Sequence, residues 1–533
     1  MRWLLMIGAL ALAGCFGARE APHRRTLIDS RDNYDPRSLD PALSTDVPTG
    51  RAVGYLFDGL TRFTPDAHVE PALADRWDVT PDGRRYTFHL HRGVRFQDGT
   101  PLDAQRVIGS WERVLDPRTK GGRGEPLLPI LGARDYAAGR AHSIAGLSAP
   151  DDSTLVVTLA EPLAIFPKLL AMPVASVVPA NTPENFGEHP VGTGPWKLVE
   201  WKHDDFLLFA RNANYFLGPP KAESLRARII AEPSTAAAEF ESGSVDVIQI
   251  PASDAPEWEE DESRRSMLAS TPALELVYIG INTTRGPLRD ARVRQAINYA
   301  IDTRTIVERL IGGRGTRAAG VIPPALDGYD STRHPYPFDQ AKARQLLAAA
   351  GYPNGIDVEL WTSTTPIYVR MAETIQAYLN AVGIRTKIVQ RESAASRAAA
   401  RKGETDMILK DWYADYPDAE NFLYPLLHSA NKGVGGNVSF YSNPTFDSLV
   451  TASRRELDQA RRDSLYRAAD SLAFADAPMV FLYFYNELYA VQPWIRGFRP
   501  PVIFNGQRWL NVTITRASAD STPPAPRPPP HAR

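Results

Sequence analysis

Apolar residues in the second half of the chain recur alternately at the spacing of a helix and at that of a strand. One helical stripe lies within residues 293–301 and another within residues 371–382. Short apolar runs typical of strands lie on either side of the second helix, at residues 358–361 and 384–389. This order of strand, helix and strand predicts a βαβ unit with parallel strands, and therefore an α/β fold.

The first half of the chain carries the same two signals. A strand is expected to hold Tyr86, Phe88 and Leu90 on one face, because they alternate with polar residues. Three aspartates stand directly before helical patterns and are expected to cap those helices: Asp103, Asp290 and Asp339. The helix after the first of them should bury a stripe formed by Val107, Ile108, Trp111, Val114 and Leu115.

Two long elements are predicted near the C-terminus. A helix is expected over residues 454–475, and an apolar aromatic strand over residues 479–491. The residues expected to face inward from this helix are Leu457, Leu465, Ala468 and Leu472.

Residues 411–418 combine three carboxylates with three aromatic rings, and they follow an apolar run at residues 407–409 that is typical of a buried strand. A strand that ends in such a loop presents its side chains at the carboxyl edge of a sheet, where open α/β sheets bind ligands. Aromatic walls around a carboxylate suit a ligand with a cationic group and an apolar body. The pattern also fits an acidic surface loop whose rings pack on the core, and spacing alone does not separate the two interpretations.

Composition limits the classes of protein to consider. A chain of 533 residues is too long for one hydrophobic core, so two or more lobes are expected. Hydrophobic residues make up 43% and charged residues 23%, as in ordinary soluble proteins. The formal net charge is -2, since 60 Lys and Arg residues nearly balance 62 Asp and Glu residues. This balance argues against a nucleic-acid partner and against a polybasic membrane-binding stripe.

The two ends of the chain carry signals of their own. Residues 1–14 have the short positive start and the apolar run of a secretory signal peptide. Cys15, the only cysteine, ends a Leu-Ala-Gly-Cys sequence that resembles the bacterial lipobox, in which this cysteine becomes the lipidated first residue. Residues 15–23 would then form a tether, and the predicted location is the periplasm or the cell surface. Residues 517–533 are rich in Pro, Ala and Ser, so a disordered tail is expected.

Four stretches contain residue motifs whose spacing matches that of one protein family. Residues 77–117 read Trp, then Asp-Gly-x-x-Tyr-Thr-Phe-x-Leu, Arg-Gly-Val-x-Phe-x-Asp-Gly and Trp-x-Arg-x-Leu-Asp-Pro. Residues 191–198 read Val-Gly-Thr-Gly-Pro-Trp-Lys-Leu, and further matches lie at residues 290–302 and 341–353. Together they resemble the family 5 extracellular solute-binding proteins, the peptide- and nickel-binding receptors of bacterial ABC importers. The resemblance covers nearly the whole mature chain.

The resemblance implies a two-lobed α/β fold of the type II periplasmic binding proteins, with an additional small inserted domain. Lobe I would comprise residues 24–61, 188–283 and 491–516. The inserted domain would occupy residues 62–187, and lobe II residues 284–490. Ligand capture by closure of the two lobes is the mechanism that this fold implies.

The resemblance also suggests how a peptide is held. In this family an aspartate in a Trp-x-x-Asp motif binds the α-amino group of the peptide, and Trp412 to Asp415 match that motif. Asp415 is therefore the expected ammonium ligand, with Trp412, Tyr413 and Tyr416 beside it. The alternative for Asp415 is a helix cap or a loop salt bridge.

A second site residue is suggested for the other end of the ligand. Dipeptide receptors of the family hold the free carboxylate with an arginine near the start of the helix over residues 368–382, where this chain has Arg370. An alignment shift of one position would place Val369 there, and Arg370 would then be solvated helix surface. Without such an arginine, longer peptides or another ligand become the better interpretation.

The predicted function is capture of short peptides by a lipid-anchored, monomeric receptor that passes them to an ABC permease in the membrane. One alternative is the same receptor fold with a non-peptide ligand such as a nickel complex, haem or a sugar. Another is a surface or signalling protein that has kept the fold.

Catalysis is not expected. The sequence has no GxSxG motif, no free cysteine beyond the predicted lipidation site and no metal motif. The ten histidines show no paired ligand spacing, so neither a metal nor a cofactor is predicted. The turn at residues 192–194 lacks the Lys-Ser/Thr pair and the long helix that a phosphate-binding loop needs.

Overall fold

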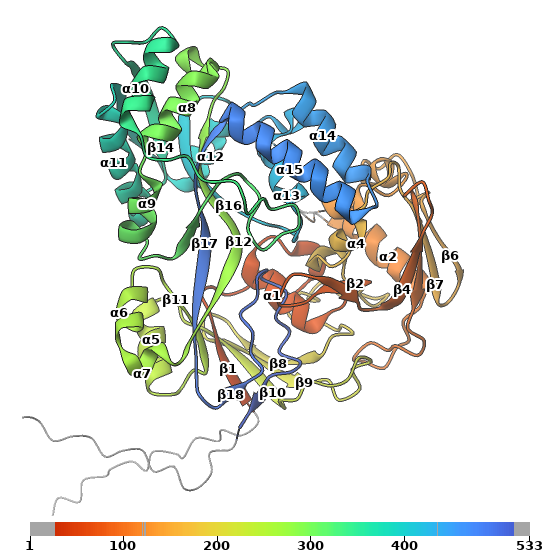
Figure 1. The fold of residues 1–533 in the computed structure, drawn as a ribbon. Coiled ribbons are helices and arrows are strands. Elements are labelled where there is room, and N and C mark those ends of the chain that lie inside the picture. The colour runs from red at the N-terminus through yellow and green to blue at the C-terminus, as the bar shows by residue number, and fades with distance from the viewer. Residues whose placement is uncertain (1–26, 120, 122–123, 434, 516–533) are drawn as a thin grey trace, which may run out of the picture.

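A computed structural model describes residues 27–119, 121, 124–433 and 435–515 (Figure 1). The predicted signal peptide, the predicted lipidation site Cys15 with its tether, and the predicted disordered tail lie outside these residues. Among the described residues, no helix is both long enough and apolar enough to cross a membrane. The described chain forms one large mixed sheet, three smaller sheets and the helices that cover them.

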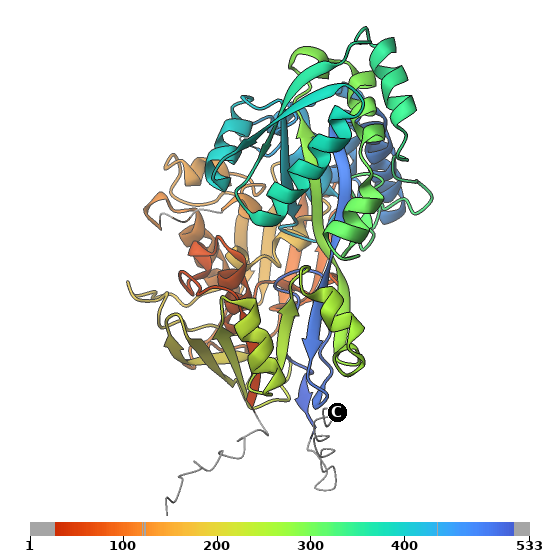
Figure 2. The ribbon, with the colours of Figure 1, turned by 90° about the vertical axis from the view of Figure 1, so that its left-hand side faces the viewer.

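The large sheet joins the two lobes through two long antiparallel strands, β12 (Leu268–Ile281) and β17 (Met479–Val491). They run side by side from the lower to the upper part of the molecule, as Figures 1 and 2 show. The predicted strand over residues 479–491 is confirmed. In order across the sheet, the strands are β15 (Ile384–Gln390), β14 (Ile356–Thr362), β16 (Met407–Tyr413), β12, β17, β11 (Val247–Ile250), β1 (Leu27–Asp32), β10 (Ser224–Ile229), β9 (Phe206–Arg211) and β8 (Trp196–Lys202), while β13 (Gly315–Arg317) pairs with β17.

Lobe I is built on β1 and β8 to β11. Strand β1 pairs in parallel with β10, so the carboxyl ends of both strands lie at the same edge of the sheet, toward lobe II. A two-stranded sheet of β18 (Ile495–Arg496) and β19 (Thr513–Ile514) lies nearby. The helices of this lobe are α1 (Val47–Leu56), α5 (Pro233–Glu241), α6 (Ala255–Glu260) and α7 (Glu262–Arg265).

Lobe II contains the predicted βαβ unit. Strands β14 and β15 are parallel and α11 (Pro366–Asn380) connects them, which confirms the α/β prediction. The remaining helices are α8 (Ala291–Ala300), α9 (Thr303–Thr305), the π-helix η6 (Ile306–Leu310), α10 (Gln340–Ala349), α12 (Ser393–Arg401), α13 (Glu420–Leu427), α14 (Pro444–Arg455) and α15 (Gln459–Asp476). Short 3₁₀ turns occur across the molecule at Pro41–Leu43, Pro117–Thr119, Glu125–Leu127, Pro173–Ala175, Gly286–Arg289 and Ser429–Asn431.

A separate antiparallel sheet and its own core lie in the predicted inserted domain, on the right in Figure 1. The sheet has the order β4 (Ala74–Val79), β5 (Arg85–Leu90), β7 (Thr154–Thr158) and β6 (Leu147–Asp151). Helix α2 (Ala104–Leu115) buries its five predicted apolar residues against it, as predicted. The other elements are α3 (Ala133–Ala137), α4 (Phe166–Leu169) and a hairpin of β2 (Thr61–Phe63) and β3 (Val69–Pro71). The exact domain boundaries stay a prediction.

All three predicted aspartate caps are confirmed. Asp103 accepts a hydrogen bond from the backbone N–H of Arg106 at 2.7 Å. Asp290 and Asp339 do the same at the starts of α8 and α10, at 2.8 Å in each case. These helices therefore begin where a side-chain oxygen satisfies an otherwise unpaired backbone donor.

The single helix predicted over residues 454–475 is wrong. The chain breaks between α14 and α15, because Asp458 caps a new helix through the backbone N–H of Arg461. Leu457 lies in the break and its side chain is exposed. The predicted Leu465 and Leu472 are only half-buried and Ala468 is exposed. The buried face of α15 instead mixes alanines with polar residues, among them Asp470, which receives a hydrogen bond from Arg333 at 2.9 Å. Hydrophobic spacing alone missed this face because paired polar side chains occupy it.

The glycines at residues 192 and 194 allow a close backbone approach. The N–H of Gly194 donates to the carbonyl of Leu56 at 2.9 Å, at the end of α1. A Cβ atom on Gly192 would lie 1.9 Å from that same carbonyl oxygen, which no other residue type can accommodate. The motif thus packs lobe I backbone against α1.

The same end of α1 is held by a buried ion pair. Arg508, from the C-terminal segment, donates to Asp58 at 2.6 Å and to the carbonyls of Gly54 and Phe57 at 2.6 and 2.9 Å. Tyr215 also donates to Asp58, at 2.9 Å. Both charged side chains are nearly inaccessible to water, so each depends on the other for compensation.

Replacing Arg508 by Met should therefore destabilise the protein by about 3–5 kcal/mol, because Asp58 would remain buried without its cation. The measurement is urea unfolding followed by tryptophan fluorescence. Arg385→Met is the matched control, since Arg385 pairs with Asp357 on the open surface and should leave stability essentially unchanged. Equal losses in both variants would contradict the role assigned to Arg508.

Candidate ligand-binding cleft

Strand β16 continues beyond the predicted run and includes the first residues of the 411–418 stretch. Its partner is β12, with Tyr413 opposite Glu275 and Asp411 opposite Val277. Residues directly opposite on paired strands share a face, and so do residues two apart. Tyr413, Asp411 and Glu275 therefore project together from one face of the sheet, where β12 passes between the lobes.

A cavity in lobe II lies beside this end of β16. It brings together three of the predicted site residues, Trp412, Tyr413 and Asp415. The other residues around it come from α11, α12, β16 and the position after β14: Ser363, Tyr368, Ser393, Ser396, Arg397, Arg401, Ile408, Leu409, Lys410 and Asp411.

Asn421 fixes the geometry of the Trp-x-x-Asp motif. Its side-chain oxygen accepts a hydrogen bond from the backbone N–H of Asp415 at 2.9 Å. The same oxygen accepts from the indole Nε1 of Trp412 at 3.4 Å. One residue of α13 thus ties both ends of the motif together, which holds Trp412 and Asp415 at the cavity.

The other two predicted ligand residues lie elsewhere. The hydroxyl of Tyr416 donates to Glu420, and its ring packs against the cores of the inserted domain and of lobe II. Arg370 lies on the exposed face of α11 and does not line the lobe II cavity. A ligand contact by Tyr416 or Arg370 stays a prediction.

Asp418 connects the motif loop to the inserted domain. Lys168, on α4, donates to the Asp418 carboxylate at 2.6 Å and to the Pro417 carbonyl at 2.9 Å. Tyr466 donates to the other carboxylate oxygen at 2.7 Å. Burial would raise the pKa of Asp418, but Lys168 and these hydrogen bonds hold it below its ordinary value. The third carboxylate of the 411–418 stretch is therefore a structural anchor.

Charges of both signs surround the lobe II cavity. Burial lowers the pKa of Lys410 to about 8, an effect that Asp411 opposes and that Arg401 and Arg397 strengthen. Tyr368 donates to Asp411 at 3.1 Å. This mixture suits a ligand that carries charged and neutral hydrogen-bonding groups rather than a purely apolar one.

Between the lobes, carboxyl groups crowd together on β12, β16 and β17. Burial raises the pKa of Glu275 to about 8, and the nearby charges of Asp411 and Glu487 contribute to the shift. The pKa of Tyr413 is raised by burial and by Glu487 and Glu275, while Arg51 of lobe I opposes this shift. A cation from lobe I thus acts on a tyrosine of lobe II across the cleft.

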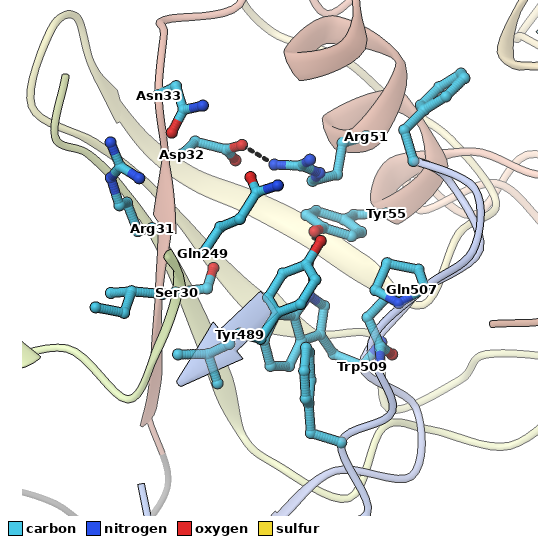
Figure 3. A pocket seen from close by; sticks show the side chains of 15 residues that line it. Ser30, Arg31, Asp32, Asn33, Arg51, Tyr55, Gln249, Tyr489, Gln507 and Trp509 are labelled. Atoms are coloured by element: carbon cyan, nitrogen blue, oxygen red, sulfur yellow. Dashed lines mark hydrogen bonds and ion pairs between the residues drawn. The ribbon is translucent and has the colours of Figure 1, made fainter. Parts of the chain in front are cut away.

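A second cavity, in lobe I, was not predicted from the sequence. It lies at the carboxyl end of β1, where Arg51 pairs with Asp32 among the rings of Tyr55, Tyr489 and Trp509 (Figure 3). These residues come from β1, α1, β17 and the C-terminal segment. No local motif connects them, so only the three-dimensional fold reveals the group.

The chain matches the family model of the bacterial extracellular solute-binding proteins, family 5 (middle region), over residues 68–434. It belongs to this family. This family 5 protein is 32% identical over 474 residues to heme-binding protein A of Haemophilus influenzae, with 84% of each chain covered. It is 31% identical over 498 residues to glutathione-binding protein GsiB of Pectobacterium atrosepticum, covering 90% of this chain and 92% of that one.

Solved structures agree with the family assignment. HbpA2 from Haemophilus parasuis superimposes with a TM-score of 0.82 at 28% identity, covering 92% of this chain and 100% of that chain. The periplasmic binding protein DppA from Helicobacter pylori, in complex with the peptide STSA, gives 0.74 at 28% identity, covering 92% and 99%. The predicted two-lobed type II fold with its inserted domain is thereby confirmed, as is an extracytoplasmic solute-binding role.

Replacing Glu275 by Gln should change how stability depends on pH. The folded protein keeps the Glu275 proton up to a pKa of about 8, whereas the unfolded chain releases it near the ordinary value of 4.5. The folded state therefore binds more protons between these values, so raising the pH destabilises the wild type there. The melting temperature of Glu275→Gln relative to wild type should rise from pH 5 to pH 9.

Thermal melts at several pH values measure this difference. Glu373→Gln is the control, because Glu373 lies on the exposed face of α11. A Glu275→Gln difference that stays constant across the pH range would show that this carboxyl ionises normally.

Proposed function

We propose that this family 5 protein is a lipid-anchored receptor that captures short peptides by closure of its two lobes and delivers them to an ABC importer. Asp415 binds the α-ammonium group of the peptide, while Trp412 and Tyr413 flank it. The observation that carries this proposal is the joint position of all three residues at one cavity beside the strands that link the lobes. The bound peptide in DppA supports the ligand class.

The edge of β16 offers a place for the peptide main chain. On one side β16 pairs with β12 along its whole length. On the other side β14 pairs only with residues 407 and 408, and no other described strand pairs with residues 409–413 at that edge. An extended peptide can add as a strand there, an interaction that recognises backbone and tolerates varied side chains.

A non-peptide ligand such as haem is the second candidate. The 32% identity to heme-binding protein A favours it, whereas the charged lining of the lobe II cavity favours a peptide. The two candidates differ in the compound that the purified protein would retain.

Mass spectrometry of compounds released on denaturation should show short peptides with free amino termini. Titration calorimetry with one of these peptides should then show that Asp415→Ala weakens binding by about 1.5–3 kcal/mol, because a charge-assisted bond to the ammonium group is lost. Asp357→Ala, on the open surface of lobe II, is the control. Recovery of haem, or unchanged affinity in Asp415→Ala, would remove the ammonium role.

The lipid anchor has its own test. Cys15→Ser should leave the protein unlabelled by radioactive palmitate and move it from the membrane fraction to the soluble extracytoplasmic fraction, because Cys15 is the only thiol available for acylation. Peptide affinity should stay the same. Palmitate labelling that persists in Cys15→Ser would refute the anchor.

A further inference from the structure

The lobe I cavity has the composition of a subsite for part of a ligand. Aromatic rings form its walls, and Figure 3 shows the amide of Gln249 and the guanidinium of Arg51 extending into the same space above the rings of Tyr55 and Tyr489. A concave aromatic pocket with a few convergent polar groups is the usual form of a small-molecule site. The carboxyl end of a parallel strand, here β1, is also where such sites occur.

Most of the hydrogen-bond donors of Arg51 have no acceptor among the residues that the structure describes. Its Nη1 donates to Asp32, and no other hydrogen bond of this guanidinium occurs within the part of the chain that the structure describes. The Arg51 side chain keeps 27% of its surface accessible, against 9% for Asp32. A guanidinium has five N–H donors in a planar fork, so the unused ones are available to a ligand.

The lobe I cavity lies beside one of the strands that link the lobes, since Tyr489 of β17 lines it. Burial lowers the pKa of Arg51, but Asp32, Tyr55, Tyr489 and Glu487 raise it above its ordinary value. The Arg51 charge in turn opposes the rise in the pKa of Tyr413 in lobe II. Strand β16, which carries Tyr413, and strand β17, which carries Tyr489, both pair with β12, so a ligand that begins at Asp415 would continue along these strands toward Arg51. Lobe II would hold its cationic end and lobe I its other end.

We propose that Arg51, assisted by Gln249, binds a carboxylate of the ligand in the lobe I cavity. A guanidinium recognises a carboxylate through two parallel N–H···O bonds, and aromatic walls shield such bonds from water. The proposal rests on the proposed peptide-receptor function and names the group that the second lobe recognises. It assigns to lobe I the role that the sequence had suggested for Arg370, which lies on exposed helix surface.

Neighbouring carboxyl groups do not oppose this assignment. Asp32 is already paired with Arg51. Glu487 accepts a hydrogen bond from Tyr489 at 2.6 Å, and burial raises the pKa of Glu487. A ligand carboxylate would thus share the Arg51 fork with Asp32.

The test compares two probes by titration calorimetry, Ala-Ala-Ala with a free carboxylate and the same tripeptide with a C-terminal amide. Wild type should bind the free acid about tenfold or more tightly than the amide. Arg51→Gln should bind both equally, and Gln249→Leu should lose part of the preference. Arg85→Gln, at an exposed position of β5 in the inserted domain, should keep the full preference.

Two further variants test whether the loss of preference comes from misfolding or from a different arginine. Asp32→Asn combined with Arg51→Gln removes both partners of the ion pair, so no buried charge is left unpaired, and it should also lose the preference. A preference that survives in Arg51→Gln, or that disappears in Arg370→Gln instead, would overturn the proposal. Equal binding of both probes by wild type would overturn it as well.

Failure of the peptide proposal gives a different result. Wild type would then bind neither probe, and the compounds released from wild type and from Arg51→Gln would be compared by mass spectrometry. Carboxylate-bearing compounds retained by wild type and lost from Arg51→Gln would support the Arg51 subsite for another ligand. Identical retention in both proteins, or no retained carboxylate-bearing compound, would overturn the subsite.

Discussion

The pairing of β12 with β17 is the constraint on which the two-lobed architecture depends. The two strands have 14 and 13 residues, which at about 3.4 Å per residue is long enough to belong to both lobes. Their register shifts between Pro272 and Leu276 and again after Val277, which is where the strands pass from one lobe to the other. Such irregularities increase local twist and re-aim side chains, so Glu275 and its neighbours meet at the cleft rather than in either core.

The cleft is assembled from segments that are far apart in the chain. Lobe II supplies the Trp-x-x-Asp motif, lobe I supplies Arg51, and the strands between them supply Glu275 and Glu487. The inserted domain also takes part, because Lys168 holds the motif loop through Asp418. The loop that carries Asp415 is therefore fixed at one side by Asn421 and at the other by a different domain. Such support from surrounding residues is what keeps a binding group in one geometry.

Much of the fold could be predicted because it follows local rules. The aspartate caps and the βαβ unit each depend on a few neighbouring residues, and the structure has them as expected. The single helix over residues 454–475 failed because Asp458 caps a new helix there. Its inward face was missed because buried polar residues, such as Asp470 paired with Arg333, lie among the alanines. Among the proposed site residues, Asp415 could be identified from a contiguous motif. Arg51 and Gln249 could not, because each is an ordinary residue of a helix or strand. Only the fold brings each of them next to residues far along the chain.

The contacts of Arg508 with the end of α1 determine when lobe I can complete its folding. Arg508 lies 450 residues after Asp58 and only a short way before the C-terminus, yet it holds the end of the helix that carries Arg51. During synthesis the N-terminal segment emerges first. Until Arg508 has been synthesised, Asp58 lacks the cation that compensates the free-energy cost of burying its carboxylate. The end of α1 therefore cannot take its final position. A chain in which residue 508 has not yet been added thus lacks one of the contacts that hold α1, the helix that carries Arg51.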